Sequence, residues 1–405
     1  MTVYRAAWVC PIAHAPIRDG WFAVASQRIV RVGEAGEPAP ASAVDLGTVA
    51  VLPGLVNAHT HVELSWLRGR VPPATNFTDW ITHLFATRGS RRETAGDLNV
   101  MEAARQAAGE AREFGTAAVG DISNSLVSVE PIRAAGLSGI VLHELLGFKS
   151  TTGQLVEDTR PYRAAAARLG GDAVRVSVSP HAPYSVSPEL FRAIRAEVNE
   201  SDVPVTSVHV GESVGEIAFL QDGTGPWPGI LAWVGATRDD WTPPGLGPVE
   251  YLDSLGVLDA RTLVVHGVQL SDDSLRRLAT IGATLVTCPR SNQWVGVGVP
   301  PIERFYASGV KLAVGTDSLA SVDDLNVFAE LKTMRWLAPT VPAARLLESA
   351  TQVGAEALGL GKELGTIQVG KQAALIAVEL PRAAIDVEEY LVSGVEARHV
   401  QWVPA

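Results

Sequence analysis

Pro53-Gly-Leu-Val-Asn-Ala-His-Thr-His61 is the stretch of sequence on which the fold and chemistry of this chain depend. Residues 55–61 have the composition of a short buried strand, and alternate side chains of a strand point to the same face. His59 and His61 would therefore lie on one face, at the end of that strand. Two imidazoles placed in this way supply half of a metal site, although a His-x-His pair can also be two hydrogen-bonded core histidines.

The composition of the chain favours a large apolar core and excludes several classes of partner. The 405 residues are 47% hydrophobic and 19% charged, with a net charge of -11. An acidic surface disfavours binding to nucleic acid. Two cysteines do not make a disulfide framework, the first residues lack the pattern of a signal peptide, and no apolar run predicts a membrane span. We therefore expect a cytoplasmic protein without nucleic-acid or membrane partners.

Short β-rich segments alternate with helical patterns along most of the chain. Strands are expected at 55–61, 116–123, 138–147, 173–181, 203–211, 262–267, 283–288 and 310–317, with helices between them at, for example, 101–114, 156–169, 188–199, 272–281 and 323–337. Eight strands that alternate with helices predict an α/β protein whose main body, residues 53–360, is a TIM-like (β/α)8 barrel.

Both ends of the chain show strand patterns broken by turn residues. Strands are expected at 4–12, 21–24, 28–32 and 44–51, again within 365–378, and at 397–403. We predict that residues 1–52 and 361–405 pair into one small β-sandwich domain beside the barrel. A stretch rich in glycine, proline and tryptophan, residues 221–248, is longer than an ordinary connection and predicts either a functional lid or a packing insertion.

Polar residues collect where the predicted strands end, which is where barrels of this kind place their active sites. These residues are His59, His61, His181, His209, Glu212, His266 and Asp317. The other histidines, His14, His83, His143 and His399, are expected to be structural.

The residue types at the strand ends favour a single divalent metal ion. Three neutral imidazoles and one carboxylate suit zinc, with iron as an alternative, and leave a position for water. We assign His59, His61, His209 and Asp317 as the ligands. The ion would lower the pKa of its water towards neutrality.

Three further residues are candidates around that metal site. Glu212 could move a proton from the water to the substrate, unless it is only a solvent-exposed acid at a helix N-terminus. His266 could hydrogen-bond the attacking water or polarise the developing intermediate. His181 is a candidate substrate contact or a packing group.

The sequence resembles the amidohydrolase superfamily, in the branch of cytosine, guanine and S-adenosylhomocysteine deaminases and chlorotriazine hydrolases. The resemblance rests on the stretch 53–61, on His209-x-x-Glu212, on His266 and on Thr316-Asp317. It implies a site with one metal ion, because no lysine ends the fourth strand. It also implies that the glutamate protonates a ring nitrogen and that Asp317 helps to activate water. The site carries no Cys-x-x-Cys, so the cytidine deaminase scaffold is excluded.

Within that branch, residues 59–69, 288–292 and 315–321 resemble the 6-aminodeoxyfutalosine deaminases of menaquinone biosynthesis. The resemblance implies conversion of adenine to hypoxanthine on a nucleoside that bears a benzoate. A small-molecule nucleoside is the expected partner, with a homodimer as the expected assembly. The segment Gln372-Ala-Ala-Leu375 departs from the pattern, because an aspartate is usual before the leucine. The candidate substrate contacts are His181, Asp79, Arg290, Asn292 and Glu63, with Arg68 and Arg70 as further partners for a carboxylate.

Three alternatives remain open at this point. The first is deamination of S-adenosylhomocysteine, adenosine or guanine. The second is displacement of chloride or another amine from a triazine or pyrimidine. The third is a barrel that binds without catalysis, which would usually have lost some of the metal ligands that are present here.

Overall fold

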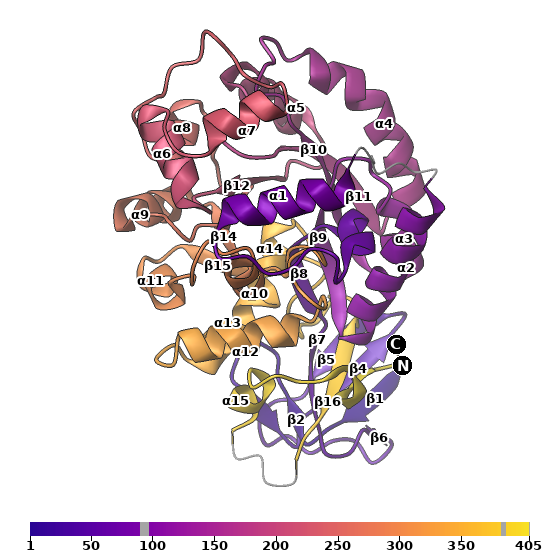
Figure 1. Ribbon diagram of the computed structural model, residues 1–405. Helices are drawn as coiled ribbons and strands as arrows, with labels where there is room; N and C mark the ends of the chain where they lie inside the picture. Colours follow the sequence, from indigo (N-terminus) through magenta and orange to yellow (C-terminus); the bar gives the residue numbers. More distant parts are fainter. Residues whose placement is uncertain (90–96, 382–385, 405) are drawn as a thin grey trace.

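Eight parallel strands form the centre of the molecule. The computed structural model describes residues 1–89, 97–381 and 386–404 (Figure 1). The eight strands are β8 (Leu55–Thr60), β9 (Thr116–Ser123), β10 (Ser138–Leu145), β11 (Val174–Pro180), β12 (Thr206–Val210), β13 (Thr262–His266), β14 (Thr284–Thr287) and β15 (Lys311–Val314). They make two four-stranded parallel sheets, in the orders β11-β10-β9-β8 and β12-β13-β14-β15. Each strand falls within or close to its predicted range, and the predicted α/β class is confirmed.

The two sheets are joined by backbone hydrogen bonds at both margins. At one margin Thr60 forms a parallel bridge with Asp317, and the N–H groups of Thr316 and Asp317 donate to the carbonyl oxygen of His59. At the other margin the N–H of His209 donates to the carbonyl oxygen of His181. These links bring the carboxyl ends of strands from both sheets to the same side of the molecule.

Helices lie between the strands and cover them (Figure 1). They are α1 (Phe77–Arg88), α2 (Leu98–Glu113), α3 (Val129–Ala134), α4 (Gln154–Gly170), α5 (Pro188–Glu200), α6 (Val214–Asp222), α7 (Trp227–Trp233), α8 (Pro248–Ser254), α9 (Asp272–Ile281), α10 (Pro289–Trp294), α11 (Ile302–Ala307), α12 (Val327–Leu337), α13 (Ala343–Ser349), α14 (Gln352–Ala357) and α15 (Val387–Leu391), with short 3₁₀ helices η1 (Val62–Leu67) and η2 (Ala397–His399). Within the described residues, none of these helices has both the length and the apolarity to span a bilayer.

The helix predicted at 323–337 begins only at Val327. The side chain of Asn326 accepts a hydrogen bond from the N–H of Phe328 and so caps the helix. Asparagine is a favoured N-cap residue because its side chain satisfies a backbone donor that has no partner inside the helix. The two aspartates before it therefore lie in the preceding loop.

The two ends of the chain meet in a β region that packs beside the parallel strands (Figure 1). One sheet has the order β5-β4-β1-β6 and the other β17-β16-β7-β2-β3. The strands are β1 (Thr2–Arg5), β2 (Trp8–Val9), β3 (Ile17–Arg18), β4 (Trp21–Ala25), β5 (Arg28–Val32), β6 (Val44–Asp45), β7 (Val49–Pro53), β16 (Leu375–Glu379) and β17 (Val400–Trp402). Strand β16 pairs antiparallel with β7, and Tyr4, Phe22, Val51 and Leu375 belong to one apolar cluster that spans both sheets. The predicted domain boundaries, whose ranges include stretches outside the described residues, stay predictions.

The glycine- and tryptophan-rich stretch 221–248 packs through its aromatic rings. The Trp227 ring lies 3.5 Å from that of Tyr184, centroid to centroid, with an interplanar angle of 14°. Trp241 stacks on Phe219 with a centroid distance of 4.2 Å. The Trp233 ring lies edge-on to that of Phe85 with a centroid distance of 5.5 Å, although the residue is 64% exposed. All three tryptophans therefore pack against other aromatic rings, Trp233 at the surface.

Candidate active site

Four histidines and one aspartate meet at the carboxyl ends of the parallel strands. The ring centroid of His59 lies 5.0 Å from that of His61, 5.0 Å from that of His209 and 5.8 Å from that of His266. Oδ1 of Asp317 lies 3.5 Å from Nε2 of His61 and 3.8 Å from Nε2 of His59. The structure thus brings together all four residues that the sequence assigns as metal ligands.

The environment of His59 fits a metal ion. The side chain is fully buried, and neither of its ring nitrogens has a hydrogen-bond partner among the described residues. A buried polar atom without a partner is costly, and coordination to a cation would remove that cost. His59 shares one possible ligand group with His61 and Asp317 and another with His209 and His266, so His266 also lies close to the ligands. Nitrogen and carboxylate donors of this kind suit a zinc-like divalent ion.

The histidines of this cluster are neutral at physiological pH. Burial lowers the pKa of His61 to about 3 and that of His209 to about 4, and the neighbouring His181 lowers both further. Burial also holds the pKa of His59 well below its ordinary value. Because a metal binds the unprotonated imidazole, these side chains are already in the form that coordinates.

Glu212 is buried at the edge of the histidine cluster. Its Oε1 atom lies 3.6 Å from Nε2 of His266, and only 5% of the residue is exposed. Burial raises the pKa of the carboxyl well above its ordinary value, and the charges of Asp317 and Glu216 raise it further. This burial contradicts the alternative of a solvent-exposed acid. A carboxyl whose pKa is raised in this way is suited to general acid–base chemistry.

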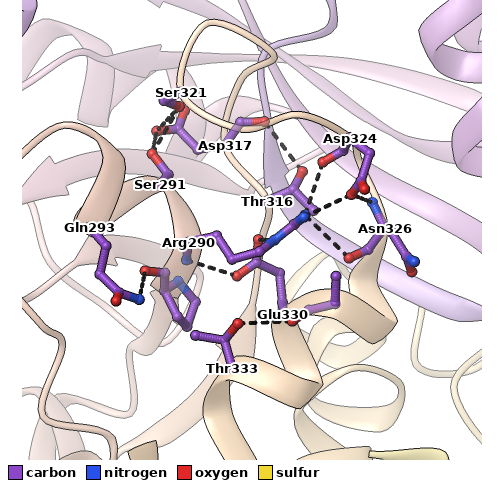
Figure 2. A network of polar contacts seen from close by, with 12 residues as sticks. Arg290, Ser291, Gln293, Thr316, Asp317, Ser321, Asp324, Asn326, Glu330 and Thr333 are labelled. Atoms are coloured by element: carbon purple, nitrogen blue, oxygen red, sulfur yellow. Dashed lines mark hydrogen bonds and ion pairs between the residues drawn. The ribbon is translucent and has the colours of Figure 1, made fainter. Parts of the chain in front are cut away.

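Two residues of helix α10 orient members of the site. Oγ of Ser291 donates to Oδ2 of Asp317 at 2.6 Å (Figure 2). Nδ2 of Asn292 lies 3.0 Å from Nδ1 of His266. Sequence reasoning named Asn292 only as a substrate contact and missed Ser291. Its place inside the quoted segment 288–292 was the available signal.

Glu144 is a second residue that sequence reasoning missed. Its Oε1 atom lies 3.6 Å from Nδ1 of His209 and has no hydrogen-bond partner among the described residues, while Oε2 accepts from Asn124 at 3.0 Å. Burial raises the pKa of this carboxyl. An acidic residue at the end of the third strand was the available signal. The ring centroid of His181 lies 5.0 Å from that of His209, and His181, His209 and Glu144 form a further group of possible metal ligands.

Several predicted substrate contacts are engaged with other parts of the protein. The carboxylate of Glu63 accepts hydrogen bonds from the backbone N–H of Asn124 at 2.8 Å and from the hydroxyls of Ser123 at 2.6 Å and Ser125 at 2.7 Å. Asp79 is exposed at the start of α1 and accepts from Asn76. The geometry therefore gives Glu63 the role of holding the loop after β9.

The three arginines proposed for a substrate carboxylate also have partners. The guanidinium of Arg290 donates to Oε1 of Glu330 at 2.7 Å and to Oδ1 of Asp324 at 2.8 Å (Figure 2). Arg68 pairs with Glu110, and Arg70 lies over the ring of Trp66. The structure therefore gives no support to Arg290 or Arg68 as a substrate contact, because substrate would have to displace their carboxylate partners.

Comparison with known proteins gives one consistent family. The family described as "Amidohydrolase family" matches this chain over residues 50–400. A 5-methylthioadenosine/S-adenosylhomocysteine deaminase of Moorella thermoacetica is 30% identical over 98% of this chain and 90% of its own. An aminodeoxyfutalosine deaminase of Deinococcus radiodurans is 32% identical over 79% of this chain and 76% of its own.

A solved structure extends this likeness to the fold. The crystal structure of an adenosine deaminase from Xanthomonas campestris with bound zinc superposes with a TM-score of 0.78 at 26% identity, over 98% of this chain and 90% of that one. Sequence and structure agree over nearly the whole length, and this chain belongs to the amidohydrolase family.

Proposed function

We propose that this protein is a metal-dependent hydrolase that removes the amino group of an adenine nucleoside. The observation that carries the proposal is the buried carboxyl of Glu212, placed 3.6 Å from His266 beside the cluster of His59, His61, His209 and Asp317. The names of the relatives from Moorella thermoacetica and Deinococcus radiodurans support the same chemistry. The buried ligand set argues against a non-catalytic binding protein.

We also propose that the eight parallel strands close into one (β/α)8 barrel over residues 53–360, with residues 1–52 and 361–405 as the small β domain. The hydrogen bonds at both margins of the two sheets support this closure. The ion would be a single zinc held by His59, His61, His209 and Asp317, a choice that the donor types support. A homodimer and a cytoplasmic location stay predictions of the sequence.

Each residue of the site has a separate role in the proposed deamination. A bound divalent ion supplies acidity to a coordinated water, so that a nucleophile is available near neutral pH. Glu212 accepts a proton at that position and delivers it to N1 of the purine, which opens C6 to attack. His266, beside Glu212, directs the attacking oxygen. The amino group then leaves C6 as ammonia, and the base becomes hypoxanthine.

The substrate that we propose is 6-aminodeoxyfutalosine. The relative from Deinococcus radiodurans supports it, but a benzoate in the site would need a cation, since a buried unpaired carboxylate is costly. Arg88 on α1 is close enough to the cluster for its charge to lower the pKa of His61, after the larger effects of burial and His181. We therefore propose Arg88 as the partner of the carboxylate, which would replace the contact that Arg88 already makes within the chain.

The second candidate substrate is 5-methylthioadenosine or S-adenosylhomocysteine, because the relative from Moorella thermoacetica covers nearly the whole chain. The test compares kcat/KM for aminodeoxyfutalosine, adenosine and S-adenosylhomocysteine, with a chlorotriazine as a further substrate. We expect aminodeoxyfutalosine to give the highest value, and Arg88→Ala to raise its KM without changing that of adenosine. A higher kcat/KM for S-adenosylhomocysteine would move the assignment to the second candidate. Turnover of the triazine alone would contradict deamination.

A further inference from the structure

Three consecutive side chains of the short helix α10 contact three different parts of the molecule. Arg290 points towards helix α12, Ser291 towards Asp317, and Asn292 towards His266. Ser291 and Asn292 have no exposed surface. One helical turn therefore contacts two members of the active site and one element outside it, and Figure 2 shows the contacts of Arg290 and Ser291.

The contact with Ser291 divides the roles of the two oxygens of Asp317. Oδ2 accepts from Oγ of Ser291 at 2.6 Å and from Oγ of Ser321 at 3.4 Å. Oδ1 is left facing Nε2 of His61 at 3.5 Å and Nε2 of His59 at 3.8 Å. The backbone of Asp317 has a φ of 62°, a left-handed conformation that residues other than glycine rarely adopt. The hydroxyls thus fix which oxygen is presented to the histidines.

The contact with Asn292 selects the tautomer of His266. In the orientation that the structure gives the amide, Nδ2 donates to Nδ1 of His266, which leaves the ring proton on Nε2. That proton faces Oε1 of Glu212, 3.6 Å from Nε2. His266 also has a left-handed backbone, with a φ of 76°. The direction and the protonated nitrogen of this ring therefore both depend on Asn292.

A buried ion pair fixes the position of the turn that carries these contacts. The backbone N–H of Arg290 donates to Oε2 of Glu330 at 3.1 Å, and its Nε donates to Oε1 at 2.7 Å. Glu330 has no exposed surface. The Nη1 and Nη2 atoms of the guanidinium donate to Asp324: Nη1 to Oδ1 at 2.8 Å and Nη2 to the carbonyl oxygen at 2.9 Å. Because one residue supplies both backbone and side-chain donors to the same carboxylate, α10 cannot shift against α12 without breaking both bonds.

We propose that Arg290, Ser291 and Asn292 form one positioning element, clamped by Glu330, that orients the metal-facing oxygen of Asp317 and holds His266 with its proton on Nε2. The proposal rests on the proposed function, in which Asp317 and His266 act on the reacting groups. None of the three α10 residues needs to touch substrate in this role. Residues that orient metal ligands from behind typically change metal affinity or activity by about 10–100-fold when replaced.

The sharpest test exchanges the amide of Asn292 for a carboxylate of the same shape. In Asn292→Asp the side chain accepts from Nδ1–H, which reverses the tautomer of His266 while the packing volume is kept. We expect kcat to fall at least about 10²-fold, with KM changed less than about threefold. The direct readout is the pair of ¹⁵N shifts of the His266 ring in zinc-loaded protein labelled at histidine. An unchanged tautomer together with unchanged kcat would overturn the proposal.

The contact of Ser291 with Asp317 allows a second test, which does not depend on the tautomer of His266. Ser291→Ala removes only the hydroxyl, so it should keep the fold but lower zinc affinity, measured by competition with a chelator, by about 10-fold or more. Ser291→Thr restores the hydroxyl and should recover most of that affinity. Equal zinc affinity in wild type and Ser291→Ala would remove Asp317 from the proposal.

The clamp is tested by Arg290→Lys, which keeps the charge but loses the fork that reaches Glu330. The matched control is Arg195→Lys, a buried arginine paired with Asp259 ahead of β13, away from the site. We expect both variants to lose stability and only Arg290→Lys to lose kcat. Equal kcat in the two variants would overturn the role of the clamp.

Two variants of the site itself separate this proposal from the proposed function. Asp317→Asn and His266→Ala should both be nearly inactive if these residues act as proposed. Activity in both would contradict the proposed function. Inactivity in both, with wild-type behaviour in Asn292→Asp and Ser291→Ala, would overturn the positioning role alone.

Discussion

At the scale of single residues, burial determines the chemistry of the site. The same low-dielectric environment keeps the imidazoles neutral, which metal binding requires, and raises the pKa of Glu212, which general acid–base catalysis uses. The two effects have opposite signs because burial penalises the charged form of each group. Burial is the largest cause of these shifts, and the charge of Arg88 adds to it at His61.

Glu212→Gln tests the assignment of the proton carrier. The amide has nearly the shape of the protonated acid but cannot transfer a proton, so kcat should fall by about 10²–10⁴-fold while one metal ion per chain is retained. Steady-state kinetics and elemental analysis measure the two quantities. Glu303→Gln, a surface position bonded to Thr340, serves as the control. A kcat within about threefold of wild type would rule out Glu212 as the shuttle.

The sequence predicts the residues that carry chemistry better than the residues that hold them. His59, His61, His209 and Asp317 are predictable because each lies at or just beyond the end of a strand whose pattern is plain. The partner of Arg290 is not, because Glu330 lies 40 positions away on another helix and no local pattern specifies that contact. An arginine beside a predicted site looks the same whether it binds substrate or a buried carboxylate.

At the scale of elements, Asp121 on β9 ties the segment after β8 to the body of the protein. Its Oδ1 accepts from the N–H of Val62, the first residue of η1, at 2.7 Å, and its Oδ2 accepts from Oγ of Ser128 at 2.5 Å. Burial raises the pKa of Asp121 to about 8 from an ordinary value of 3.8. The protonated form is therefore the one that the folded protein accommodates.

This raised pKa predicts a dependence of stability on pH. The folded state binds the proton more tightly than the unfolded state, so stability falls as pH rises from about 4 to about 8 and is then constant. Asp121→Asn, which stays neutral, should remove a decline of several kcal/mol, at about 1.4 kcal/mol per pH unit. Chemical denaturation at several pH values measures it, with the exposed Asp273→Asn as control. Parallel curves for wild type and Asp121→Asn would contradict the assignment.

Element boundaries show where sequence patterns reach their limit. Two predicted strands, 4–12 and 44–51, are each two strands that belong to different sheets. Gly47 interrupts the second with a φ of 82°, which only glycine adopts at little cost. An apolar run predicts that a segment is extended, but it contains no information about which sheet each half will join.

At the scale of the whole molecule, the last strand connects the β region to the parallel strands. Nε1 of Trp402 on β17 donates to the carbonyl oxygen of Arg112 at the end of α2, at 2.9 Å, and the Arg112 guanidinium lies over the Trp402 ring. The ring also packs close to Gly54, ahead of the metal-binding strand. Residues far apart in the sequence thus meet just before the stretch that carries His59.

Trp402→Ala should therefore destabilise the whole chain. Removing a fully buried Trp typically costs about 3–5 kcal/mol, and Trp402 is only partly buried, so we expect about 2 kcal/mol. Denaturant unfolding measures the change. Trp336→Ala, at a position 72% exposed on α12, is the control and should shift the free energy of unfolding by less than about 0.5 kcal/mol. Equal effects of the two substitutions would show that this contact does not stabilise the chain.

The pairing of the two ends could be predicted because both carry short strand patterns that lack a partner nearby. The contact of Trp402 with α2 could not, since it depends on how the β region docks. Docking is determined by the shapes of assembled surfaces, and no periodic pattern in a sequence describes those.

Deamination of an adenine nucleoside with one metal ion per chain is tested directly by titrating metal-free protein with zinc. The quantity measured is the rate of ammonia release. Metal-free protein should be inactive, and activity should rise linearly and reach its limit at one equivalent of zinc per chain. The His209→Ala variant should not recover under the same titration. Full activity without metal would contradict a metal-dependent deaminase, and a rise that continues to two equivalents would contradict a site for a single ion.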